Sequence, residues 1–240
     1  MSTTQRIVAI TGAAGALGGA LAETLSGRGY KVALFDTERR RDRLAELAAS
    51  IGASAFAFAS DFASDSAWGA ALDAAKTALG GAPTHAALAA GAWAGGAPLH
   101  ETRDDATYQQ MITTNVDSTY RALRALLPQM VAAKSGSIVV VGSRAVPRPW
   151  TSGGAAAYAA AKAAVVTIAQ AVAEEVLSEG VRVNAILPST MDTPANRAAM
   201  PDADASKWVS VASAAGVIAF LLSDDARDVS GAAIPIYGRA

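Results

Sequence analysis

The sequence predicts an α/β fold: a doubly wound parallel sheet of about seven strands, with helices on both faces. Three observations predict it. Short apolar runs alternate with longer helical patterns along the 240 residues. The runs are apolar throughout, as in strands that are covered on both faces. A glycine-rich loop separates the first run from the first helical pattern. This regular alternation favours right-handed crossovers between parallel strands.

Each strand is expected at an uninterrupted apolar run, and each helix in the alanine-rich or periodic sequence between two runs. The strands are expected at residues 6–10, 31–35, 53–59, 85–89, 137–141, 181–187 and 232–236. The helices are expected at residues 15–27, 38–49, 65–79, 103–133, 156–178 and 208–222. No linker or internal repeat is visible, so we expect residues 1–240 to form one domain.

Composition excludes several function classes. The chain has no cysteine, which rules out disulfides, a thiol nucleophile and cysteine-ligated metal, and its two histidines lack metal-ligand spacing. We therefore expect no metal. The net charge is −1 and there is no basic stripe, which argues against a nucleic-acid partner. No secretory segment or apolar run of membrane-spanning length is visible, so a soluble, cytoplasmic protein is expected.

Gly12, Gly15 and Gly18 lie between the first strand and the first helix. Glycines there permit a tight turn and a close approach of phosphate, and the helix N-terminus offers free N–H groups to a pyrophosphate. The strand–loop–helix context is that of a Rossmann dinucleotide site. The plainer alternative is an ordinary turn between a strand and a helix.

Asp36 ends the second strand, about 20 residues beyond the glycine loop. Its carboxylate is placed to accept hydrogen bonds from the adenine ribose and to repel a 2′-phosphate, which favours NAD(H) over NADP(H). The arginines at residues 39–41 could instead reach a phosphate, so NADP(H) remains possible.

Tyr158 and Lys162 are four residues apart in an alanine-rich stretch, so they share one helix face. An ammonium close to a phenol is expected to lower the tyrosine pKa and to favour proton exchange near neutral pH. Residues 144–154 are expected to form a loop. Residues 189–206 break the periodicity around Pro194 and Pro201 and are expected to form a substrate lid.

Together these features resemble the short-chain dehydrogenase/reductase family, over essentially the whole chain. By this resemblance Tyr158 and Lys162 match the catalytic pair, Ser143 the catalytic serine and Asn115 the asparagine inside the fourth helix. The resemblance implies cofactor contacts at Gly12, Gly15, Ala16, Leu17, Gly18, Asp36, Asp61, Phe62, Ala90, Gly91, Lys162, Pro188 and Thr193.

The resemblance also implies roles in carbonyl reduction. Tyr158 would donate the proton as general acid, and Lys162 would stabilise the phenolate and hold the nicotinamide ribose. Ser143 would hydrogen-bond the substrate oxygen. Asn115 would hold a water that links Lys162 to solvent. The plainer alternatives are that Ser143 merely ends a strand and that Asn115 caps a helix irregularity.

Several departures from the family pattern stand out. Leu88 and Ala89 replace two asparagines that brace the sheet near the cofactor, and Ser189 replaces the glycine after Pro188. The loop between the serine and the tyrosine is two residues longer than usual. Separately, residues 15–18, 91–96 and 187–197 are similar to the quinonoid dihydropteridine reductases, which lack the serine and asparagine that this chain has.

Trp93 and Trp150 are candidate substrate contacts because they follow strands at the expected catalytic edge, where either could stack on a flat ring. Arg144, beside Ser143, could bind an anionic or carbonyl-rich substrate or could point to solvent. The resemblance implies a homotetramer or homodimer that acts on a small molecule. Two alternatives stay open: a quinonoid dihydropteridine reductase, and a non-catalytic protein that senses NAD(H).

Overall fold

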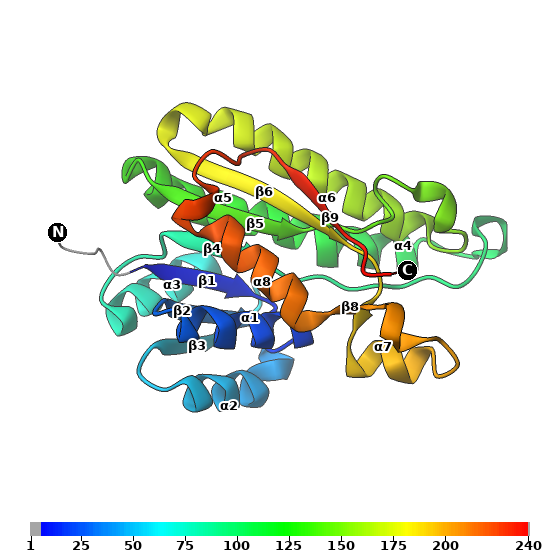
Figure 1. Cartoon of the computed structure of the whole chain (residues 1–240), viewed down its shortest axis with the longest axis horizontal. Helices are drawn as coiled ribbons and strands as arrows, with labels where there is room; N and C mark the ends of the chain where they lie inside the picture. Colours follow the sequence, from blue (N-terminus) through cyan, green and yellow to red (C-terminus); the bar gives the residue numbers. More distant parts are fainter. Residues whose placement is uncertain (1–5, 240) are drawn as a thin grey trace.

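The computed structural model describes residues 6–239. Its centre is a parallel sheet of seven strands, in the order β3-β2-β1-β4-β5-β6-β9 (Figure 1). The strands are β1 (Ile7–Thr11), β2 (Lys31–Asp36), β3 (Ala55–Ala59), β4 (His85–Leu88), β5 (Gly136–Val141), β6 (Val181–Pro188) and β9 (Ala233–Ile236). The predicted doubly wound α/β class is therefore confirmed.

Helices cover both faces of the sheet. The helices are α1 (Ala16–Gly27), α2 (Arg41–Ile51), α3 (Asp65–Leu79), α4 (Ala106–Met111), α5 (Ser118–Ala132), α6 (Ala156–Glu175), α7 (Pro194–Ala199) and α8 (Val211–Leu222). One apolar core joins α3, α5 and α6 to the sheet, and a second core joins α1, α2 and α8 to its other face. Both faces of the strands are consequently buried, which explains why the runs are apolar throughout.

The structure corrects three predicted elements. The helix expected at 103–133 begins at Ala106 and is interrupted by a π-helical turn, η3 (Ile112–Asp117). The helix expected at 208–222 begins at Val211, after a short strand, β8 (Val209–Ser210). The segment 189–206 is not irregular, because it contains α7 and a short strand, β7 (Met191–Asp192), that pairs with β8.

One of the described helices, α6, is long and apolar enough to cross a membrane by length and composition alone, with a mean hydropathy of 1.4. The sequence prediction concerned an uninterrupted apolar run, and it still holds because Lys162 and Gln170 interrupt the apolar sequence of α6. In the structure α6 packs against the sheet through Val165, Val166 and Ala169, and it carries the buried Lys162. An alanine-rich helix that covers a parallel sheet has the same composition as a membrane span.

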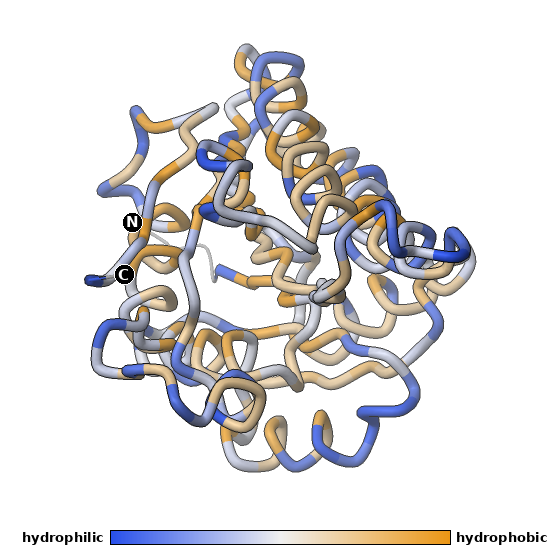
Figure 2. The backbone as a smooth tube through the Cα atoms, turned by 90° about the vertical axis from the view of Figure 1, so that its right-hand side faces the viewer, coloured by the Kyte–Doolittle hydropathy of each residue, from blue (hydrophilic) through white to orange (hydrophobic). Residues whose placement is uncertain are grey.

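The register of the sheet brings the carboxyl ends of its central strands level. Thr11 pairs with Phe35 on one side and with Leu88 on the other, and Leu88 pairs with Val140. The loops that follow these strands therefore gather at one edge of the sheet, the carboxyl rim. Figure 2 looks from the right-hand side of Figure 1, toward which the strand arrows point. Ligands of open α/β sheets bind at such an edge.

Candidate active site

The glycine loop closes tightly between β1 and α1. Gly12 has a φ of +66°, and a Cβ there would lie 2.9 Å from the backbone of Ala90. A Cβ on Gly18 would lie 2.3 Å from Gly12 O, so the first turn of α1 packs too closely against the loop for any side chain at this position. These positions admit only glycine, which explains the spacing seen in the sequence.

The first turn of α1 is open to an anion. Gly15 at its N-cap offers no side-chain cap and the turn has no acidic residue, whereas α3 is capped by Ser64 and α8 by Ser210. The amides of Ala16 and Leu17 have no hydrogen-bond acceptor within residues 6–239. Free amides at the positive end of a helix dipole suit the pyrophosphate of a dinucleotide.

Asp36 lies at the end of β2 beside this turn. Its Oδ2 accepts the amide of Ala14 at 2.9 Å and its Oδ1 accepts the amide of Thr37 at 2.8 Å. The side chain of Arg40 reaches the same loop, where it donates to Ala14 O at 3.4 Å. The carboxylate is thus held at the rim, with one cation of the 39–41 run close to it.

Asp61 and Phe62 follow β3 on the next strand outward. Asp61 is exposed, and its Oδ1 accepts the amide of Ala63 at 3.1 Å. Phe62 packs its ring 4.7 Å from the ring of Trp68 and 5.7 Å from that of Phe35. The contacts of Phe62 are those of a core residue, so only Asp61 presents a free side chain at the predicted adenine end.

Asn115, which is fully buried in η3, holds the loop after β4 by hydrogen bonds. Asn115 Oδ1 accepts the amide of Ala92, and its Nδ2 donates to the carbonyls of Ala92 and Met111. These bonds cap the π-helical irregularity, as the plainer alternative has it. A Cβ on Gly91 would lie 2.7 Å from Asn115 Oδ1 and 3.2 Å from Lys162 Nζ. Only glycine therefore lets this loop, η3 and α6 meet.

Tyr158, Lys162 and Ser143 meet at the same rim. The tyrosine and the lysine lie in the first two turns of α6, and Ser143 follows β5 as a buried residue. Burial raises the pKa of Tyr158 above its ordinary value, and a hydrogen bond with Ser143 opposes that rise. Burial lowers the pKa of Lys162 to about 8. The same Ser143 hydroxyl accepts the amide of Ala145 at 3.1 Å.

The expectation that Lys162 lowers the pKa of Tyr158 was wrong for the chain without ligands. Lys162 Nζ donates instead to Val141 O, 2.8 Å away. Desolvation dominates the tyrosine, and the group that opposes it is Ser143. Sequence spacing places two side chains on one helix face, but it does not show which acceptor the longer one reaches.

Pro188 ends β6, and Thr193 lies in the segment that follows it. Pro188 O accepts the amide of Arg144 at 2.9 Å, which ties the segment after β6 to the loop after β5. Thr193 caps α7 through its Oγ1, which accepts the amide of Asn196. The segment is braced further by a bidentate ion pair between Asp192 and Arg197, with distances of 2.6 and 2.8 Å.

Trp93 and Trp150 project from two loops that are joined to each other, since Gly96 N donates to Gly154 O at 2.8 Å. Both indoles are mostly exposed, at 61% for Trp93 and 78% for Trp150. The two indoles therefore present a large exposed apolar surface on two loops that are hydrogen-bonded to each other. Arg144 is half-buried.

Sequence reasoning missed two contributors to the rim. Thr11 Oγ1 accepts the amide of Ala90 at 3.1 Å and so braces the loop that lacks the asparagines. Tyr237 contacts the rim twice: its ring lies 5.0 Å from the guanidinium of Arg148, and its carbonyl accepts from Ser189 Oγ. Thr11 could have been recognised from the sequence, because it is a polar residue at the end of the apolar β1 run. No local pattern signalled Tyr237.

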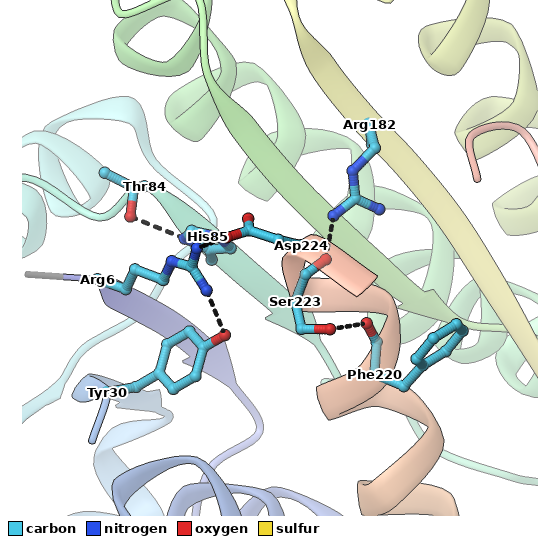
Figure 3. A network of polar contacts seen from close by, with 8 residues as sticks. All are labelled: Arg6, Tyr30, Thr84, His85, Arg182, Phe220, Ser223 and Asp224. Carbon is cyan, nitrogen blue, oxygen red and sulfur yellow. Dashed lines mark hydrogen bonds and ion pairs between the residues drawn. The ribbon is translucent and has the colours of Figure 1, made fainter. Parts of the chain in front are cut away.

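The opposite edge of the sheet carries a separate polar network (Figure 3). Arg6 pairs with Asp224 and donates to Tyr30, and His85 bonds Thr84 through Nδ1 at 2.8 Å. A cavity of about 470 Å³ lies beside it. Arg182, which lines the cavity, already donates to the carbonyls of Leu221, Ser223 and Val229, so this network holds the end of α8 to the sheet.

Comparison with known proteins gives a consistent result. A family model described as short chain dehydrogenase matches residues 6–204. The chain is 30% identical to the uncharacterised oxidoreductase YmfI of Bacillus subtilis over 95% of this chain and 96% of that protein. It is 31% identical to the 2,5-dichloro-2,5-cyclohexadiene-1,4-diol dehydrogenase LinX of Sphingobium indicum over 97% and 95% of the two chains.

Other relatives are matched over part of their length. The alignment with the 3-oxoacyl-acyl-carrier-protein reductase FabG of Escherichia coli, at 32% identity, covers 56% of this chain and 57% of FabG. Among solved structures, the 3-ketoacyl-acyl-carrier-protein reductase of Brucella melitensis complexed with NADH is 26% identical. It superposes with a TM-score of 0.85 over 98% of both chains.

Proposed function

The chain belongs to the short-chain dehydrogenase/reductase family of NAD(P)-dependent oxidoreductases, and we propose that it interconverts a carbonyl and an alcohol with Tyr158 as general acid and base. One observation carries the proposal. The uncapped, glycine-lined N-terminus of α1 opens at the same rim as Tyr158, Ser143 and Lys162. That rim joins a place for a dinucleotide to a group that transfers a proton.

The residues present fit a dinucleotide. The amides of Ala16 and Leu17 would bind the pyrophosphate, and Asp36 would accept from the adenine ribose. Gly91 and Pro188 would border the nicotinamide end, because Gly91 approaches Lys162 and Pro188 is bonded to the loop after β5. Thr193 would follow on the same segment, at the start of α7. The nicotinamide supplies the hydride when the cofactor is bound.

The protein's own part in reduction is proton delivery. Tyr158 donates its phenolic proton to the substrate oxygen as negative charge develops there. Ser143, which opposes the rise in the pKa of Tyr158, would orient the same oxygen. Lys162 lies one turn further along α6, and its ammonium stabilises the phenolate left behind. Asn115 holds the loop after β4 against η3 at Ala92, which keeps Gly91 next to Lys162.

We propose NAD(H) as the preferred coenzyme. Asp36 is fixed by two backbone amides and has no ion-pair partner within the described residues, so its carboxylate would repel a 2′-phosphate even though Arg40 reaches the carbonyl of Ala14 in the same loop. Asp36→Ala should raise the ratio of NADPH to NADH turnover at least tenfold. A wild-type enzyme that already prefers NADPH would contradict this assignment.

The deciding assay measures NADH oxidation with ketones, with keto acids and with quinonoid dihydropterin. Ketone or keto-acid turnover supports the proposal. Turnover confined to the pterin would favour the dihydropteridine reductase alternative, for which the local sequence around residues 187–197 is the specific observation. NADH binding without turnover of any compound would favour the sensing alternative.

We also propose that residues 189–206 form a lid and that the chain assembles as a homodimer or homotetramer in the cytoplasm. The exposed Tyr108 on α4 and Tyr120 on α5 support the assembly, because large aromatic side chains are typical of interfaces. Sedimentation of the purified protein would decide between the two sizes.

A further inference from the structure

Arg144 stands apart from the other arginines of the described chain. Four arginines within residues 6–239 are only half-exposed: Arg6, Arg121, Arg144 and Arg182. Arg6 pairs with Asp224, Arg121 pairs with Asp117, and Arg182 donates to three carbonyls. The guanidinium of Arg144 has no hydrogen-bond or ion-pair partner in this part of the chain. A partly desolvated charge without a partner costs stability, and a bound anion would offset that cost.

The backbone of Arg144 is fixed at the catalytic rim. Its amide donates to Pro188 O at 2.9 Å, and its carbonyl accepts the amide of Arg148 at 3.2 Å. Ser143, the residue before it, is buried, and its hydroxyl accepts the amide of Ala145. The side chain therefore starts from a braced position, one residue from the group that we assign to the substrate oxygen.

No neighbouring carboxylate within the described residues neutralises the positive charge of the loop after β5. Arg148 lies over the ring of Tyr237 and forms no ion pair within residues 6–239. Asp192 on β7 is held bidentately by Arg197, and this pairing lowers the pKa of Asp192. Two arginines on the loop after β5 are thus left without a carboxylate, beside a neutral tyrosine and serine.

We infer that Arg144 binds a carboxylate of the substrate, so that the enzyme acts on oxo acids or hydroxy acids. This inference rests on the proposed function and names the substrate class of the same site. Arginine suits the role because its planar donors match a carboxylate in two parallel hydrogen bonds. A carboxylate held there would fix the carbonyl relative to Ser143 and Tyr158.

The test compares a 3-oxo acid with its methyl ester in the wild type, Arg144→Gln and Arg144→Lys. The control is Arg28→Gln, an exposed and unpaired arginine in the turn after α1. In Arg144→Gln, kcat/KM for the acid should fall about tenfold to a hundredfold, as for loss of a charged hydrogen bond. Ester turnover and the NADH Kd should stay within about twofold, and Arg144→Lys should restore part of the loss.

Three outcomes would overturn the inference: an acid-to-ester ratio unchanged in Arg144→Gln, a parallel loss of NADH affinity, or a preference for a phosphorylated ketone over the oxo acid. The parallel loss would assign Arg144 to the cofactor. A binding experiment keeps the test independent of turnover. Calorimetry with butanoate and the NADH complex should give heat for the wild type and none for Arg144→Gln. If no carbonyl compound is turned over, the proposed function fails, whereas the butanoate titration still decides the role of Arg144.

Discussion

Lys162 donates from Nζ to the backbone carbonyl of Val141, 2.8 Å away at the end of β5. The bond joins the helix that carries Tyr158 to the strand that leads to Ser143. It also explains how a buried ammonium is tolerated, because a buried charge needs at least one strong acceptor. The lysine is therefore a structural link of the catalytic rim in addition to the role that we propose for it in catalysis.

The pKa of about 8 for Lys162 predicts the pH dependence of reduction. The ammonium loses its proton as the pH rises through that value, and a neutral amine does not stabilise the phenolate. We expect kcat/KM for reduction by the free enzyme to fall about tenfold per pH unit above pH 8. Lys162→Arg, which stays charged, should be slower and should lack this limb. An unchanged limb in Lys162→Arg would assign the titration to another group.

Two adjacent glycines of α1 form a matched pair. A Cβ on Gly18 would lie 2.3 Å from Gly12 O and 2.6 Å from Ala13 Cα, whereas a Cβ on Gly19 would meet nothing nearer than 3.9 Å. Gly18→Ala should therefore cost about 2 kcal/mol or more in unfolding free energy and weaken NADH binding at least tenfold. Gly19→Ala should bind NADH normally and gain up to about 1 kcal/mol. Equal NADH affinity in both variants would show that the loop does not hold the cofactor.

Residues 237–239 bond to two segments that are distant in sequence, at Ser189 and at Lys207. Gly238 has a φ of +64°, and a Cβ there would lie 2.7 Å from Lys207 O, which also accepts the amide of Arg239. Gly238→Ala should displace Lys207, which follows the proposed lid at residues 189–206, and raise the substrate KM several-fold, with NADH affinity little changed. Gly216→Ala, in an open site on α8, is the control and should leave KM unaltered. A normal KM in Gly238→Ala would show that this segment does not affect substrate binding.

His85 predicts acid sensitivity of the fold. Its pKa is lowered to about 4, first by burial and then by Arg6 and Arg182, and Asp224 opposes the shift (Figure 3). The unfolded chain therefore binds more protons than the folded chain between about pH 6.5 and 4. Unfolding free energy should fall by about 3 kcal/mol as the pH drops through that window. Urea titrations of His85→Gln should show a much smaller drop, and an identical drop would contradict the assignment.

The sequence was sufficient for the fold because the signal was redundant. Continuous apolar runs such as residues 137–141 match buried strands closely, and Gly12 and Gly18 admit no side chain in the structure. Boundaries were weaker where a tertiary contact decided them. The π-helical turn around Asn115 depends on bonds to Ala92, which is distant in sequence, and no helical periodicity reports that contact.

The candidate site was predictable in its position and less so in its electrostatics. Tyr158, Lys162 and Ser143 were expected at one rim, where the structure has them. The direction of the tyrosine pKa was not, because burial and the lysine's acceptor depend on the surrounding fold. The unpartnered guanidinium of Arg144 was not predictable either, because the partners of the half-exposed arginines include residues distant in sequence and carbonyls of the folded backbone.

Replacing the Tyr158 hydroxyl tests the central claim most directly. Tyr158→Phe removes one oxygen atom and leaves the ring in place, so the fold and NADH binding should be retained. We predict that single-turnover NADH oxidation with a reducible carbonyl substrate slows about 10²- to 10⁴-fold while the NADH Kd stays within about twofold. A single-turnover rate equal to that of the wild type would show that Tyr158 is not the proton donor.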